Sequence, residues 1–299
     1  MTTEDRVERL VEQLGPLTGA ELQAQTKDEV FDCWKAAMLS SRLAVRKVGA
    51  RYLRLDRKVD GFARLSPSIL REFLTYSAVG LAGDTTALDG KAAEVLAHIQ
   101  AVSRAKLDLA AGVAARVADD PPPEQRFCVF IAGDVVYEMA HDVPRPERST
   151  GKMVRGSDLD LVVIVDDAAP DALPRQLDES IYQQKYRHLI DPSAREEIDY
   201  IVKRFQRLRE QAGFDTFKKM VACKILREGV FLHGSRTLFD AAKALLHEHA
   251  VTRKLAAMDI DAARLRRDAE QYLLSTDQSV LTGDDLHLFY TADESEEFE

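Results

Sequence analysis

Three consecutive prolines, Pro121 to Pro123, divide the chain into two parts with different hydrophobic patterns. Each proline lacks a backbone N–H and restricts the residue before it, so a helix is not expected to continue through this point. Before the prolines, from Thr3 to about Ala118, apolar residues recur at helical spacing among good helix formers. After them, short apolar runs alternate with turn residues. The sequence therefore predicts an α+β chain with an N-terminal helical domain.

The helical part is expected to contain one helix over residues 27–48 and a long one over residues 88–117. Ser66 followed by Pro67 predicts an N-cap with proline in the first helical position. Beyond the prolines, strands are expected at 127–132, 159–165, 198–202 and 230–232, with helices between them and from about residue 235 to 274. This pattern predicts four parts: the helical domain 1–120, a core over 124–245, C-terminal helices over 246–290 and an acidic tail over 291–299.

Composition excludes several classes of protein. Lys and Arg total 41 against 50 for Asp and Glu, a net charge of −9, so the chain as a whole repels a long polyanion. The cysteines, Cys33, Cys128 and Cys223, are far apart and lack CxxC spacing, which argues against both a disulfide framework and a zinc site. The sequence has no apolar run long enough to span a bilayer. We therefore expect a cytoplasmic protein that does not bind membranes.

Two aspartates open the most apolar strand of the chain, in the run Asp158-Leu159-Asp160-Leu161. Since side chains alternate along a strand, both carboxylates project to one face, about 7 Å apart. Two anions this close raise each other's pKa unless a cation lies near them. Hard oxygen ligands on a strand suit Mg²⁺ or Mn²⁺ better than zinc. The alternative is an exposed edge strand whose acids face water.

A third acid, Asp199, lies in the next predicted strand between Ile198 and Tyr200. If this strand lies beside the first, three carboxylates converge, as two-metal phosphoryl transfer requires. The alternative is an acid at the end of the strand that pairs with Arg195 or Lys203.

These segments resemble the core of the DNA polymerase β-like nucleotidyltransferase superfamily, including its minimal and bacterial defence members. The resemblance covers about residues 126–240. Four segments carry it: the strand 127–132 with its glycine turn, the run 155–163, the strand at 198–200 and the helix-to-strand segment 224–234. It implies a mixed sheet with flanking helices. It also implies that Asp158, Asp160 and Asp199 are the catalytic acids and hold Mg²⁺ (or Mn²⁺).

Where the family has Gly-Ser after the first strand, this chain has Gly133-Asp134, so a phosphate-binding hydroxyl is replaced by a carboxylate. The resemblance assigns nucleotide binding to Gly133, Asp134 and Ser157. Asp134 is alternatively a further acid facing the metal. The side chains in loop 141–157 that are candidates to replace the hydroxyl are Ser149, Thr150, Lys152 and Arg155.

Family members often place a lysine against the triphosphate on the helix after the third acid. The candidates are Lys218, Lys219 and Lys224, of which Lys224 fits best. Residues 195–227 include nine basic and five acidic residues, a local positive excess that suits phosphate. The alternative is that most of these cations lie on solvated helix faces.

The sequence thus predicts an Mg²⁺-dependent nucleotidyltransferase that transfers a nucleotide from an NTP or dNTP, with ATP among the candidates and the base and sugar left open. The acceptor hydroxyl stays open: a nucleotide or oligonucleotide, as in antiviral defence, a protein, a tRNA or an antibiotic. The opposing hypothesis is a non-catalytic scaffold that binds a partner protein through the helical domain.

Overall fold

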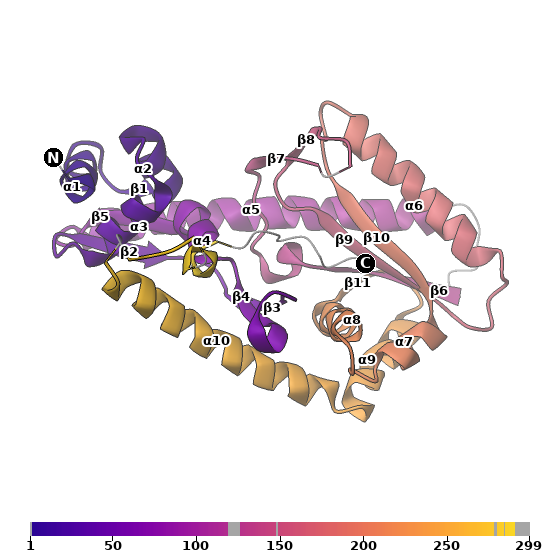
Figure 1. Ribbon diagram of the computed structural model, residues 1–299. Helices are drawn as coiled ribbons and strands as arrows, with labels where there is room; N and C mark the ends of the chain where they lie inside the picture. The colour runs from indigo at the N-terminus through magenta and orange to yellow at the C-terminus, as the bar shows by residue number, and fades with distance from the viewer. Residues whose placement is uncertain (1, 119–125, 148, 278–279, 284, 291–299) are drawn as a thin grey trace. The chain divides into compact units, whose positions relative to one another are not determined.

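The computed structural model describes residues 2–118, 126–147, 149–277, 280–283 and 285–290, and these form two compact units (Figure 1). Unit 1 contains the described residues of Met1–Ile99 and Met258–Glu294, and unit 2 contains those of Gln100–Ala257. The division falls inside two helices, α5 (Thr85–Ala118) and α10 (Val251–Ser275). The prolines 121–123 and the acidic tail 291–299 lie outside the described residues.

Unit 1 contains strands β1 to β5 in a part of the chain predicted to consist mainly of helices. The helix predicted over 27–48 ends at Leu39, because the Ser40 hydroxyl accepts a hydrogen bond from the Arg42 N–H and turns the chain. The following segment forms β2 (Leu43–Lys47), which pairs antiparallel with β5 (Ser77–Leu81). The sheet order is β1-β5-β2.

The remaining elements of unit 1 surround this sheet. The N-cap near the cis Ser66–Pro67 bond is Ser68, which accepts from the Arg71 N–H at 3.1 Å, and not Ser66 as predicted. The ring of Phe289 packs against Trp34 and Phe31 in the core. These elements are α1 (Thr3–Leu14), β1 (Leu17–Thr18), α2 (Gly19–Thr26), α3 (Val30–Leu39), β3 (Tyr52–Leu55), η1 (Asp60–Phe62), β4 (Ala63–Ser66), α4 (Ile69–Thr75) and η4 (Asp285–Leu288).

Unit 2 is built on a four-stranded mixed sheet of order β10-β9-β6-β11. The predicted strands β6 (Phe127–Ala132) and β9 (Leu159–Val165) are confirmed, and β10 (Ile198–Arg204) and β11 (Val230–Gly234) run two residues beyond their predicted ends. Strand β10 is parallel to β9, whereas β6 is antiparallel to both β9 and β11. The chain is therefore a mixed α+β protein, as predicted.

Helices cover both faces of this sheet. Leu159, Leu161 and Ile198 lie in one core cluster with residues of α5 and α6. On the opposite face the ring of Phe130 packs at a tilt against that of Phe239 in α9 (Arg236–Glu248). The other elements are η3 (Asp134–Tyr137), β7 (Pro144–Pro146), β8 (Met153–Arg155), α6 (Leu173–Ile190), α7 (Phe205–Gln211), α8 (Phe217–Glu228) and α9 (Arg236–Glu248). Within the described ranges, no helix has both the length and the apolar character needed to cross a membrane.

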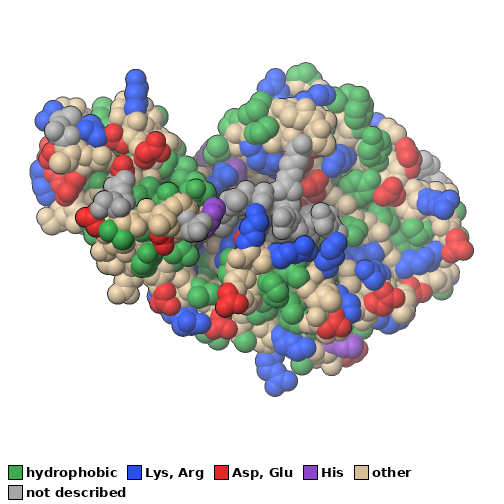
Figure 2. All heavy atoms as spheres, viewed as in Figure 1, with side chains coloured by type: hydrophobic (Ala, Val, Ile, Leu, Met, Phe, Trp, Pro, Cys, Tyr) green, Lys and Arg blue, Asp and Glu red, His purple; other side chains and the backbone are tan. Residues whose placement is uncertain are grey.

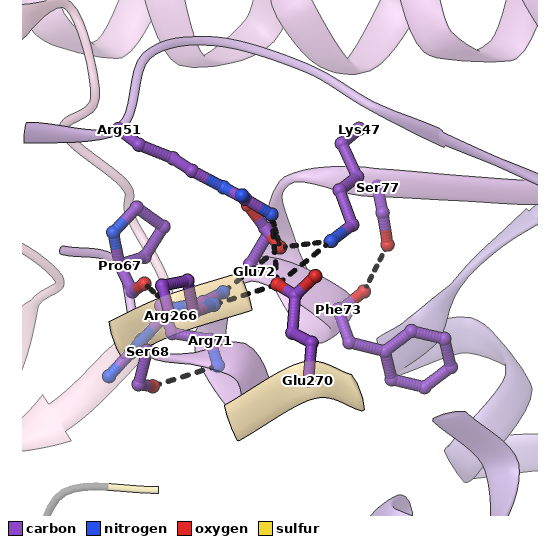
Figure 3. Close-up of polar contacts among 10 residues, drawn as sticks. All are labelled: Lys47, Arg51, Pro67, Ser68, Arg71, Glu72, Phe73, Ser77, Arg266 and Glu270. Carbon is purple, nitrogen blue, oxygen red and sulfur yellow. Dashed lines mark hydrogen bonds and ion pairs between the residues drawn. The ribbon is translucent and has the colours of Figure 1, made fainter. Parts of the chain in front are cut away.

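A buried network of charges ties α10 to the rest of unit 1 (Figure 3). Glu72 is 4% exposed and contacts Arg51 at 2.5 Å, Lys47 at 2.9 Å and Arg266 at 3.0 Å. Glu270 contacts the same three cations at 2.7–3.1 Å. Burial alone would raise the pKa of Glu72, but its three cationic partners lower it from 4.5 to about 2. The carboxylate is therefore a structural anion.

We predict that Glu72→Gln lowers the free energy of unfolding of unit 1 by about 3 kcal/mol at pH 7, because it leaves three cations around one acid. Trp34 is the only tryptophan of the chain and lies in the core of unit 1, so its fluorescence during urea unfolding measures the effect. The lowered pKa of Glu72 gives its full stabilisation above about pH 4.5, and the stabilisation is lost as the pH falls towards 2.

The control is Glu94→Gln, an exposed glutamate on α5. It should change the urea midpoint little. Equal effects of the two substitutions, or a difference that does not shrink at low pH, would contradict the structural role of Glu72.

Candidate functional site

The first part of the site is the turn after β6. Gly133 has φ +77°, and a Cβ on it would lie 2.1 Å from an Oδ atom of Asp160. Only glycine lets the Asp160 carboxylate lie against this backbone. Asp160 is 7% exposed as a result.

Lys224 and Glu228 of α8 hold this turn in place. The Gly133 N–H donates to Glu228 Oε1 at 3.0 Å, and the Tyr137 hydroxyl donates to Oε2 at 2.7 Å. Lys224 Nζ lies 2.9 Å from the same carboxylate, and both side chains are less than 5% exposed. Lys224, the lysine predicted to contact the triphosphate, thus lies near the turn as the buried partner of Glu228. Lys218 is exposed at the start of α8, about 9 Å along the helix from Lys224.

The predicted acids share one face of the sheet. Asp199 on β10 pairs in register with Asp160 on β9, and Asp158 precedes Asp160 by two residues. Residues paired between neighbouring strands project to the same side. The pKa of Asp158 is raised, first by burial and then by the negative charges of Asp199 and Asp134, while Arg145 opposes the rise. The carboxylate of Asp158 is therefore close enough to those of Asp199 and Asp134 to be repelled by both.

Arg145 on β7 is a cation at this cluster that the sequence reasoning missed. Its Nη1 lies 2.6 Å from Glu197 and its Nη2 lies 3.6 Å from Asp158, while Nε donates to the carbonyl oxygen of Gly156 at 2.7 Å. Glu197, also missed, is buried, and its pKa is raised by burial and by Asp158 and Asp199, while Arg145 opposes the rise. The two-residue spacing of Glu197 and Asp199 repeats that of Asp158 and Asp160, and this repeat was a readable signal.

A second cation reaches Asp199 from the neighbouring helix. Lys185 of α6 lies 2.9 Å from Asp199 Oδ1. This ion pair differs from the alternative partners Arg195 and Lys203 that the sequence suggests, since Lys203 instead donates to the side chain of Gln211 at 3.2 Å. Helix α6 packs on the other sheet face, and β10 is the edge strand, so Lys185 extends around the edge.

Ser157 brings a hydroxyl to the glycine turn. Its Oγ donates to Asp134 at 2.9 Å and accepts from the His141 N–H at 3.2 Å. The three predicted nucleotide-binding residues Gly133, Asp134 and Ser157 are thus gathered at one place. The candidate hydroxyls of Ser149 and Thr150 instead both donate to Glu147 at 2.6 Å.

The acids present the right donors for a divalent ion but are not gathered around a common point. In the part of the chain that is described, no group of three or more His, Cys, Asp or Glu side chains is arranged to hold a metal. Asp199 is turned towards Lys185, and Asp158 faces Arg145. The strand register pairs Asp160 with Asp199, so these two side chains project to the same face of the sheet, and carboxylate oxygens are ligands that Mg²⁺ prefers.

Comparison with known proteins adds no assignment. No family model, no curated protein and no solved structure matches this chain.

We predict that Gly133→Ala lowers the free energy of unfolding of unit 2 by about 2 kcal/mol more than Gly151→Ala does. Both glycines have positive φ, but a Cβ at Gly151 meets no atom within 4 Å, whereas one at Gly133 meets Asp160. Urea unfolding followed by circular dichroism gives the two values. Equal losses would show that Asp160 does not pack against the turn.

Proposed function

We propose that the chain is an Mg²⁺-dependent nucleotidyltransferase related to the DNA polymerase β-like superfamily, with its nucleotidyltransferase core in unit 2. The observation that carries the proposal is the in-register pairing of Asp160 with Asp199 beside the Gly133 turn. This pairing places two acids from different strands side by side on the sheet, and Asp158 lies two residues before one of them.

Asp158, Asp160 and Asp199 would hold the metal, which supplies positive charge to the phosphates when bound. Ser157 supports phosphate binding at Gly133-Asp134, since its hydroxyl lies beside Asp134, where the family has a serine. In the reaction, the acceptor oxygen forms a bond to the α-phosphorus and the bond to pyrophosphate breaks. A carboxylate oxygen of Asp199 would take the proton of the acceptor hydroxyl once Lys185 has moved away.

The alternative of a non-catalytic scaffold has one observation in its favour. Arg145 and Lys185 already neutralise part of the acidic cluster without any metal. We favour the enzyme because Arg145 and Lys185 contact the other acids of the cluster. Asp160, the most buried of the three predicted metal ligands, instead lies against the glycine turn.

We expect purified protein with Mg²⁺ and an α-³²P-labelled nucleoside triphosphate to form a labelled product, and Asp160→Asn and Asp199→Asn each to reduce it at least about 100-fold. Nucleotide and protein gels detect the product, whether the acceptor is a nucleotide or the protein itself. Asp240→Asn is the matched control, because this exposed aspartate of α9 pairs with Arg236 on the same helix.

A scaffold gives a different result. It yields no product with any nucleotide, and Mg²⁺ with nucleotide does not raise its melting temperature. An enzyme that lacks only its acceptor still shows the rise, because a ligand that binds the folded state stabilises it.

A second substitution tests the role of Lys185 by metal binding, with no need for the transfer reaction. Lys185→Met removes a cation 2.9 Å from Asp199, so Mn²⁺ affinity measured by electron paramagnetic resonance should rise about tenfold. Lys219→Met, which removes a cation of α8 that pairs with Asp215, should leave the Mn²⁺ affinity unchanged. Unchanged Mn²⁺ affinity with Lys185→Met would indicate that Asp199 lies outside the metal site.

A further inference from the structure

Unit 2 has a pocket at the C-terminal end of α6 that the transfer of a nucleotide, as described above, does not use. Its volume is about 330 Å³. It lies between the strand β8 and the loop that leads from α6 to β10, and Figure 1 shows the end of α6 beside the β7–β8 hairpin. The lining residues are Lys152, Met153, Leu189, Ile190, Pro192 and Arg195.

The charge of this pocket is positive. Lys152 and Arg195 are its charged lining residues, and both are exposed. Across the ranges that the structure describes, neither side chain forms an ion pair, whereas most cations near the acidic cluster do. In a protein of net charge −9, two cations in one pocket that form no ion pair among the described residues favour an anionic ligand.

The pocket continues into an exposed aromatic row. Tyr182 and Tyr186 are 51% and 53% exposed, and with Ile190 they recur every four residues, so they lie on one face of α6. Ile190 and Met153 are 43% and 49% exposed at the pocket itself. Figure 2 shows blue and green side chains next to one another at the upper edge of this unit. Exposed rings next to cations are the surface on which single-stranded nucleic acid stacks its bases.

The pocket lies within reach of the acidic cluster. The carbonyl oxygen of Arg195 accepts from the Arg155 N–H at 2.9 Å, which places the loop beside β8. Arg195 is four residues before Asp199, so their Cα atoms are at most about 14 Å apart. A ligand a few nucleotides long spans this distance.

We propose that the pocket and the Tyr182–Tyr186 row bind a short single-stranded oligonucleotide, with its phosphates at Lys152 and Arg195 and its bases on the two tyrosines. Its role as the acceptor rests on the proposed function, and a terminal hydroxyl of the strand would then reach Asp199. An acidic peptide would satisfy the cations but has no bases to stack on the exposed rings.

The test is fluorescence anisotropy with fluorescein-labelled pentaadenylate and EDTA, in the absence of any nucleoside triphosphate. Lys152→Gln with Arg195→Gln should weaken binding at least tenfold and reduce the slope of log K against log salt by about 1.4, the value for two phosphate contacts on a single strand. Tyr182→Ser with Tyr186→Ser should also weaken binding at least tenfold but leave that slope unchanged. Circular dichroism checks that each variant is folded.

The matched control is Arg207→Gln with Arg236→Gln, which removes the same charge from exposed residues of α7 and α9. It should bind the probe as the unsubstituted protein does. An equal loss in this control, or unchanged binding after the pocket substitutions, would overturn the proposal. The proposal would also be overturned if polyglutamate displaced the probe as effectively as unlabelled pentaadenylate does. That result would identify an acidic peptide as the ligand.

The binding experiment can fail or succeed independently of the proposed nucleotidyltransferase activity. Specific binding without nucleotide transfer onto any acceptor counts against the transferase and leaves the oligonucleotide site intact. Transfer onto another acceptor, without binding of the probe, counts against the oligonucleotide site alone.

Discussion

The concentration of carboxylates at the start of two parallel strands is the constraint on which unit 2 depends. Asp160 on β9 and Asp199 on β10 share one sheet face, Asp158 immediately precedes β9, and Glu197 adds a further anion. Such an arrangement is unfavourable unless cations compensate for it. The chain supplies Arg145 from the β7–β8 hairpin and Lys185 from α6, and both elements are thereby tied to the sheet edge.

The same cluster explains the surrounding turns. Gly133 lacks a side chain where Asp160 lies, and its N–H is held by the buried pair of Glu228 and Lys224. Ser157 links Asp134 to the loop that precedes β9. This concentration of anions is the feature on which the proposed metal and phosphate site rests.

Unit 2 was largely predictable because its signals are local. The apolar run Leu159–Val165 is buried along its whole length, and the structure gives the strand the same ends as the sequence did. Unit 1 was less so. Residues 27–48 keep a helical apolar period, yet the Ser40 turn and pairing with β5, more than 30 residues away, make Leu43–Lys47 a strand. Arg145, Lys185 and Glu228 escaped prediction for the same reason, since their roles depend on contacts distant in sequence.

The most direct test of the account is anomalous diffraction from crystals grown with Mn²⁺ and a non-hydrolysable nucleoside triphosphate analogue. The account predicts a manganese peak within coordination distance of Asp158, Asp160 and Asp199, with Lys185 displaced from Asp199 and phosphate density at Gly133 and Ser157. Absence of manganese from these carboxylates at saturating concentration, with Arg145 and Lys185 still in their ion pairs, would contradict it.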